Sequence, residues 1–139
     1  MNDPYDLQRF LDAQAPVYEQ VLCESQAGRK TSHWMWFVFP QIAGLGYSAM
    51  AQRYAISGRE EAVAYAEHAV LGARLRECTA LVNAVEDRTA HAIFSSPDDL
   101  KFRSCMTLFA LCAEDPSPFV AALAKYFEGS GDGVTARLL

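Results

Sequence analysis

One segment of the chain, residues 33–39, has the aromatic and β-branched content of a β-strand. The segment is short, and no second stretch of the sequence offers it a convincing partner strand. An isolated strand leaves its backbone N–H and C=O groups unpaired, which is costly in a protein interior. We therefore expect residues 33–39 to form a short buried helix or turn, and we expect the chain to fold without a sheet.

Helical signals dominate the rest of the sequence. Gly28 is a natural C-terminal stop, and Ser57 with Glu60 matches a capping box. Ser96-Pro97 followed by two acids is the clearest helix start. Apolar residues recur at helical spacing, for example at Leu71, Leu75, Cys78, Leu81, Val82 and Val85. These signals predict an all-α fold in which residues 1–139 form one compact multi-helix domain around a short, buried aromatic segment.

The length and charge of the chain limit its function. With 139 residues, 51% hydrophobic and 21% charged, it has the composition of one globular domain. The formal net charge of −5 argues against broad affinity for nucleic acids or anionic membranes. No window approaches the roughly 20 apolar residues of a membrane span. We expect neither a nucleic-acid partner nor a membrane partner.

The four cysteines give no metal signature. Cys23, Cys78, Cys105 and Cys112 form no C-x-x-C pair and have no histidine at zinc-ligand spacing. Buried free thiols are favoured over disulfides. The first residues lack the pattern of a signal peptide, so we expect a cytoplasmic protein without a metal or a cofactor.

The candidate site begins in residues 28–41, where cations, His33 and both tryptophans precede an apolar run ending at Pro40-Gln41. Aromatic walls beside a few polar groups are typical of small-molecule pockets, although a core element with a basic rim has the same pattern. Trp34 and Trp36 are about 200° apart on a helix, so one can enter the core while the other faces a cleft. The candidate ligand-binding residues are Arg29, Lys30, His33, Trp34, Trp36, Gln41, Arg53, Lys101 and Arg103.

Two of these cations follow the helix start at Ser96. Lys101 and Arg103 lie within the first turns, where backbone N–H groups favour an anion. Alternatively, they pair with Asp98 or Asp99 on their own helix. An anionic or nucleotide-like small molecule would suit the first arrangement.

His33 is a weak candidate for catalysis. An imidazole in this block suits a general acid or base, but a capping or core histidine explains it equally well. A Ser-His-Asp triad can be drawn from Ser104, His33 and Asp132, but almost any sequence contains residues from which one can be drawn. We therefore assign no enzymatic reaction.

Three functions remain open, of which a homo-oligomeric structural protein is the third. The first is binding of a nucleotide-like or phosphorylated small molecule in an aromatic and basic pocket. The second is a non-enzymatic protein–protein interaction module, anchored by an exposed tryptophan. A concave site that holds His33 with at least two cations favours the pocket, whereas Trp36 on a flat exposed patch favours the partner.

Several motifs also resemble a bacterial family. They are Leu7-Gln8-Arg9-Phe10 with Ala13-Gln14, Gly28-Arg29-Lys30 running into His33-Trp34-Met35-Trp36, Phe39-Pro40-Gln41, Gly44-Leu45-Gly46, Arg53-Tyr54, Ile93-Phe94, Asp98-Asp99-Leu100-Lys101 and Arg103-Ser104 with Met106-Thr107-Leu108-Phe109. The chain is similar to domain of unknown function 1810, some members of which carry the label calpastatin. Ala69 and Ser95 depart from the family pattern of proline and glycine at these turns.

The resemblance implies a mostly helical single domain and no established activity. The calpastatin label does not suit this chain, because calpastatins are largely disordered inhibitors and this composition is globular.

Overall fold

The computed structural model describes residues 2–139, which form ten helices. They are α1 (Gln8–Gln14), α2 (Tyr18–Ala27), α3 (Met35–Val38), α4 (Ala49–Arg53), α5 (Arg59–Glu67), α6 (Leu71–Asn83), α7 (Ala90–Phe94), α8 (Asp98–Cys112), α9 (Ser117–Phe127) and α10 (Gly133–Leu138). The only β-type pairing in these residues is one isolated parallel bridge between Ile42 and Ile56. The predicted all-α fold is confirmed.

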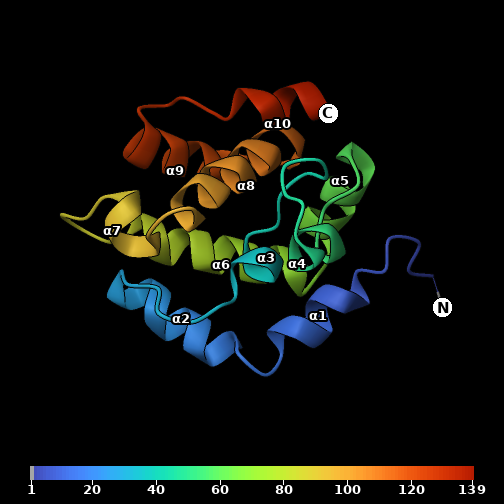
Figure 1. Cartoon of the computed structure of the whole chain (residues 1–139), viewed down its shortest axis with the longest axis horizontal. Coiled ribbons are helices and arrows are strands. Elements are labelled where there is room, and N and C mark those ends of the chain that lie inside the picture. The colour runs from blue at the N-terminus through green and yellow to red at the C-terminus, as the bar shows by residue number, and fades with distance from the viewer. Residues whose placement is uncertain (1) are drawn as a thin grey trace.

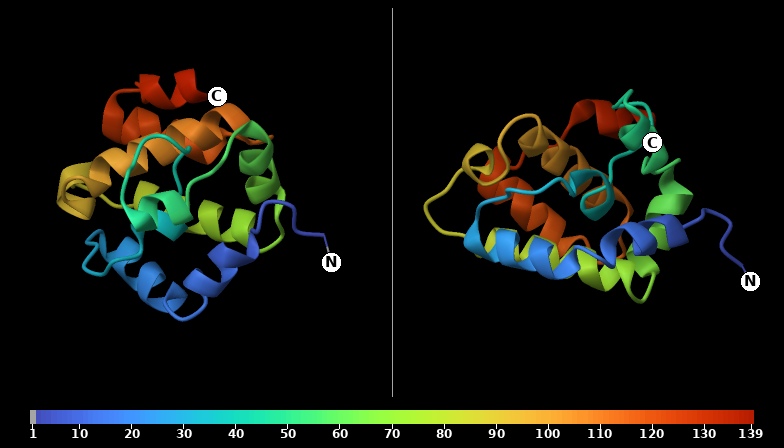
Figure 2. Two further views of the ribbon diagram at one scale, coloured as in Figure 1. Left: turned by 45° about the vertical axis from the view of Figure 1, so that its right-hand side comes forward. Right: turned by 60° about the horizontal axis from the view of Figure 1, so that its bottom comes forward.

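Helices α6 and α8 run through the middle of the molecule (Figure 1). Helices α1 and α2 lie on one side of them, and α9 and α10 lie on the other. The segment after α3 rises along this assembly toward α10 in Figure 1 and in both views of Figure 2. The segment before α3 also meets the start of α8, because the Lys30 ammonium lies 2.8 Å from the Asp98 carboxylate although the two residues are far apart in the sequence.

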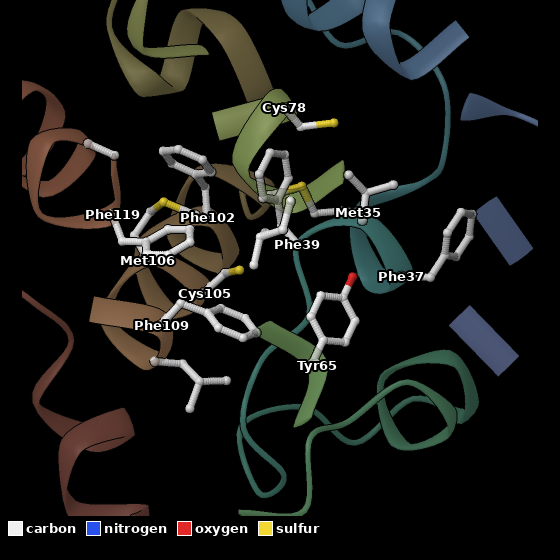
Figure 3. Packing of buried hydrophobic residues seen from close by; sticks show 14 of the residues in the cluster. Met35, Phe37, Phe39, Tyr65, Cys78, Phe102, Cys105, Met106, Phe109 and Phe119 are labelled. Carbon is white, nitrogen blue, oxygen red and sulfur yellow. The ribbon is translucent and has the colours of Figure 1, made fainter. Parts of the chain in front are cut away.

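Helix α8 is the centre of the core because it is apolar nearly all round. Phe102, Cys105, Met106, Leu108 and Phe109 of this helix are all fully buried. Figure 3 shows four of them, Phe102, Cys105, Met106 and Phe109, gathered with aromatic residues from neighbouring helices. A helix buried on so many sides has little freedom to move, so its first turn offers fixed positions to a surface site.

The aromatic segment was predicted to form a short buried helix or turn, and Met35–Val38 within it form the helix α3. Trp34, Met35 and Phe39 are almost completely buried, and Phe39 packs its edge against Phe102 with ring centroids 5.1 Å apart. Figure 3 shows Met35 and Phe39 within this cluster, while Phe37 lies apart from them. The backbone of α3 is also fixed from outside, because the buried Gln14 amide donates to the Phe37 carbonyl at 2.7 Å.

Helix ends were predicted with mixed success. Gly28 ends α2 in the left-handed conformation with φ of 69°, as predicted. The capping pair at Ser57 is shifted by one residue, because α5 begins at Arg59 and its third residue is Glu61. The carboxylate of Glu61, and not that of Glu60, accepts hydrogen bonds from the Ser57 N–H at 2.9 Å and from the Ser57 hydroxyl at 2.8 Å. Ser96 gives α8 no side-chain cap, since Pro97 occupies the cap position.

All four cysteines are free thiols. Cys78, Cys105 and Cys112 are buried and Cys23 is exposed. Burial raises the pKa of Cys78 to about 12, and it raises the pKa of Cys105 and Cys112 as well. These three thiols therefore behave as small apolar core residues.

Within the described residues, no helix has both the length and the apolar character needed to cross a membrane.

Candidate functional site

Glu24 of α2 fixes the segment that leads into α3. Its carboxylate is buried and accepts hydrogen bonds from the Thr31 N–H at 2.8 Å, the Ser32 N–H at 3.0 Å and the Trp34 indole at 3.0 Å. The Ser32 hydroxyl and the Gln20 amide donate to its second oxygen. Burial alone would raise the pKa of Glu24, but these donors outweigh it and hold the pKa well below its ordinary value. An ionised buried carboxylate thus anchors residues 31–34.

Lys30 and Lys101 share one carboxylate at the start of α8. The Lys30 ammonium, with 7% of its side chain exposed, lies 2.8 Å from one oxygen of Asp98. The Lys101 ammonium lies 3.6 Å from the other oxygen and 5.0 Å from the centre of the Trp36 ring. Two cations against one anion leave one positive charge uncompensated in this group. Lys30 is the more tightly held of the two, so Lys101 is the cation available to a ligand.

The two tryptophans have different environments, as their spacing predicted. Trp34 is 1% exposed, and its indole N–H is satisfied by Glu24. Trp36 is half-buried and lines the surface. Within residues 2–139 its indole N–H has no hydrogen-bond partner. Trp34 is therefore a core residue, and Trp36 faces the cleft.

Three adjoining hollows surround Lys101. A partly enclosed inner cavity, with a volume of about 160 Å³, is lined by Met35, Trp36, Phe39, Gln41, Ile42, Ala43, Gly44, Gly46, Ala51, Gln52, Tyr54, Ala55 and Lys101. An outer hollow includes Lys30, His33, Trp36, Asp98 and Lys101. A groove includes Gln41, Tyr47, Leu100, Lys101, Ser104, Asp132 and Val134. Lys101 lines all three, so it stands where they meet.

The structure brings five of the nine predicted residues to these hollows. Lys30, His33, Trp36, Gln41 and Lys101 line at least one of them. The other four lie elsewhere: Trp34 in the core, Arg29 exposed after α2, Arg53 in a separate depression beside Arg9, and Arg103 beside the loop after α9.

Arg103 is occupied by contacts within the protein. Its guanidinium donates to the Ser130 carbonyl at 2.9 Å, the Ser130 hydroxyl at 3.0 Å and the Gly131 carbonyl at 3.1 Å. Lys101, in contrast, contacts Asp98 on its own helix, which is the alternative that the sequence left open. The first turn of α8 therefore already holds a negative charge from its own side chain, and Arg103 is not available to bind an anion there.

The triad considered from the sequence is not assembled. The Ser104 hydroxyl contacts Asp132 directly at 3.3 Å and donates to the Leu100 carbonyl at 3.1 Å. His33 lines the outer hollow, is exposed and has no hydrogen bond within the described residues. Asp132 instead caps α10, where it accepts from the Thr135 N–H at 3.1 Å. A catalytic triad needs the imidazole to lie between the serine and the carboxylate, but here Ser104 contacts Asp132 directly.

Asp132 nevertheless affects the site, because it lines the groove. Burial alone would raise the pKa of Asp132, but hydrogen bonds from Thr135 and Ser104 outweigh it and lower the pKa. The groove that Lys101 lines therefore also contains an ionised carboxylate.

Sequence reasoning missed several of the residues that shape the cleft. Tyr47, which is 85% exposed, was not considered, and Asp98 and Asp132 were considered as an ion-pair partner and as a triad member, not as residues that line a cleft. Gln52 of α4 also lines the inner cavity, and its amide donates to the Tyr47 carbonyl at 2.8 Å. The glycine-rich stretch after Gln41 was the one available signal, since it marks the loop that forms the cavity wall.

These observations define a small all-α protein with a partly enclosed, ring-sized cavity at the start of its central helix. The family described as protein of unknown function, DUF1810, matches residues 4–139, and the chain belongs to this family. The chain is 58% identical to the conserved hypothetical protein Rv1873 from Mycobacterium tuberculosis, of known crystal structure, with a TM-score of 0.97 over 99% of this chain and 98% of that one. No protein with a curated function is significantly similar to it.

Proposed function

We propose that this protein binds a nucleotide-like or phosphorylated small molecule that combines a flat ring with an acidic group. The observation that carries the proposal is the convergence of Trp36, Gln41 and Lys101 on one partly enclosed cavity. An aromatic wall, a side-chain amide and a cation supply the apolar contact, the orientation and the charge that such ligands need. A cytoplasmic location is part of the proposal and agrees with the free, buried thiols.

The shape of the surface supports a pocket over a flat docking site. The outer hollow contains His33 together with Lys30 and Lys101, which is the arrangement that we expected of a ligand site. Trp36 is half-buried between this hollow and the inner cavity rather than exposed on an open face. The proposal is one of binding, since no carboxylate or hydroxyl contacts the exposed imidazole of His33 within the described residues.

A thermal-shift measurement against nucleotides and sugar phosphates tests the proposal. A ligand at 100 times its dissociation constant stabilises the folded state by about 2.7 kcal/mol, which gives a clear shift of the melting temperature. We expect Trp36→Leu and Lys101→Met to reduce or remove that shift. Arg29→Met is the matched control, because it also deletes one exposed cation but lies outside all three hollows.

Two results would contradict the proposal. One is the absence of a shift with every nucleotide and sugar phosphate at millimolar concentration. The other is an equal loss of binding in Lys101→Met and Arg29→Met, because a general charge effect, and not a built site, would then explain the affinity.

A second candidate function rests on the rim of the groove. Tyr47, Leu100 and Val134 expose 85%, 56% and 41% of their area beside one another. Exposed apolar residues of this kind anchor protein partners. This non-enzymatic interaction module is tested by the Tyr47→Ser variant, which would leave small-molecule binding intact and abolish capture of a protein partner.

A further inference from the structure

Two polar groups in the inner cavity have no partner inside the protein. The Gln41 side-chain amide and the Trp36 indole N–H form no hydrogen bond with any group of residues 2–139, although both line the cavity. In the core, the Trp34 indole donates to Glu24 and the Gln14 amide donates to Phe37 and Tyr65, whereas the buried Ser25 hydroxyl and the Asn83 amide oxygen have no partner. Polar groups in a concave site that lack internal partners are available to a ligand.

The chemistry of the Gln41 amide limits what it can recognise. The group presents one acceptor oxygen and one donor NH₂ side by side. A ligand edge that complements both must carry a donor and an acceptor next to each other, as the –CO–NH– edge of uracil or the carboxamide of nicotinamide does. The Trp36 N–H adds one further donor, directed at an acceptor.

The size of the inner cavity limits the ring. Its volume is about 160 Å³, close to the roughly 150 Å³ cavity that accommodates one benzene molecule in another protein. A single six-membered ring fits such a space, whereas the longer fused ring system of a purine would have to extend through its open side. Gly46 and Ala51 both belong to the wall and pack closely, because a Cβ atom added at Gly46 would lie 2.6 Å from the Cβ of Ala51.

The charges around the cavity limit the acidic part of the ligand. Lys101 is the one cation that lines all three hollows, and Asp98 compensates Lys30. Asp132 places a carboxylate in the adjoining groove. One acidic group can therefore be accommodated beside Lys101, but a second phosphate extending into the groove would approach a like charge.

We infer that the inner cavity holds a single six-membered ring bearing an adjacent hydrogen-bond donor and acceptor, and that the same ligand carries one phosphate group, placed at Lys101. The ligand class is thus a pyrimidine- or nicotinamide-type mononucleotide. This inference rests on the proposed function and adds to it the size of the ring, the hydrogen-bonding pattern of its edge and the number of phosphates.

Isothermal titration calorimetry with a matched series of commercial compounds tests the inference. The ring probes are uridine 5′-monophosphate and nicotinamide mononucleotide. Adenosine 5′-monophosphate tests the ring size, ribose 5-phosphate tests the need for a ring, and uridine 5′-diphosphate tests the phosphate count. We expect at least one ring probe to bind about tenfold tighter than the adenosine and ribose compounds, and we expect the diphosphate to bind no tighter than the monophosphate.

Variants locate the binding in the cavity. Gln41→Leu is expected to weaken the preferred probe about tenfold, the loss of one or two neutral hydrogen bonds. Gln26→Leu is the matched control, because Gln26 is exposed on α2 and lies outside the three hollows. Ala51→Leu adds bulk to the wall shared by the inner cavity and the groove, so it should abolish binding. The melting temperature of each unliganded variant shows that it remains folded.

The outcomes separate this inference from the proposed function. If adenosine 5′-monophosphate binds as tightly as the ring probes, the ring-size inference is overturned while the proposed function stands. If ribose 5-phosphate binds equally well, the cavity does not select a ring, and the inference is likewise overturned. If no compound of the series or of the wider nucleotide and sugar-phosphate panel binds, both are overturned.

Discussion

Replacing Glu24 is the sharpest test of how the site is held in place. The carboxylate of this residue is the common acceptor of five hydrogen bonds, donated by Gln20, Thr31, Trp34 and, through both its N–H and its hydroxyl, Ser32. Glu24→Ala removes the acceptor and leaves these donors without a partner, the Trp34 indole in the core among them. We expect a loss of about 3–5 kcal/mol in the free energy of unfolding.

Glu24→Gln is the matched variant, because it retains the shape and one acceptor oxygen. Three donors converge on one oxygen of Glu24, and a glutamine carbonyl can still accept them. The hydrogen bonds become neutral and therefore weaker, so we expect a smaller loss of about 1–2 kcal/mol. Urea denaturation followed by tryptophan fluorescence measures both variants. Equal losses in Glu24→Ala and Glu24→Gln would refute this reasoning, because they would show that the acceptor oxygen retained by glutamine contributes nothing to stability.

The same residue predicts a pH dependence of defined sign. The folded-state pKa of Glu24 is lowered, whereas the unfolded value is about 4.3. The contribution of Glu24 to the free energy of unfolding is therefore complete at pH values well above about 4.3. It decreases as the pH falls below about 4.3, because the unfolded chain then binds a proton that the folded chain does not. The stability difference between wild type and Glu24→Gln should be constant from pH 6 to 8 and should shrink below about pH 4.3. Parallel stability profiles down to pH 3 would show that the folded-state pKa is not lowered.

Two further predictions follow from groups outside the cleft. The Arg9 guanidinium donates to the backbone carbonyls of residues 5, 6, 53 and 55 and pairs with the buried Glu61 at 2.8 Å. Arg9→Ala should therefore lower the free energy of unfolding, measured by chemical denaturation, by about 3–5 kcal/mol. A loss below about 1 kcal/mol is typical of an exposed surface ion pair and would contradict this prediction. Iodoacetamide should modify the folded protein only at Cys23, because the other three thiols are buried. Mass spectrometry should show one adduct on the native protein and four on the unfolded chain, and rapid multiple labelling of native protein would contradict the burial.

Local signals were sufficient for the fold class and for the aromatic segment. Residues 33–39 are short and lack a partner strand in the sequence, and this predicted a short buried helix or turn, of which the structure forms the helix α3. Gly28 predicted a helix end because left-handed backbone is inexpensive only for glycine. The capping pair at Ser57 was displaced by one residue to Glu61, because the position of a helix start depends on tertiary contacts such as the Arg9–Glu61 pair as well as on local spacing.

The roles of the cations could not be predicted from the sequence. Arg103 and Lys101 are two residues apart on α8, and both follow the same predicted helix start. Arg103 reaches carbonyl groups at residues 130 and 131, which approach it only because α9 folds back beside α8. Lys101 faces the aromatic segment on another side of the helix. The difference between a structural and a ligand-facing cation therefore depends on which carbonyls the packing of distant helices brings within reach.

The same distinction divides the aromatic block itself. Trp34 and Lys30 have their polar atoms satisfied by Glu24 and by Asp98, so they hold the site together. Trp36 and Gln41 present polar atoms with no partner in the described chain to a cavity of about 160 Å³. In the described residues nearly all buried polar side-chain atoms have a partner, and the exceptions are the Ser25 hydroxyl and the Asn83 carbonyl oxygen, which lie outside the cavity. Trp36 and Gln41 are instead half-buried residues that line the same cavity as Lys101, and this convergence is the physical reason for placing the ligand there.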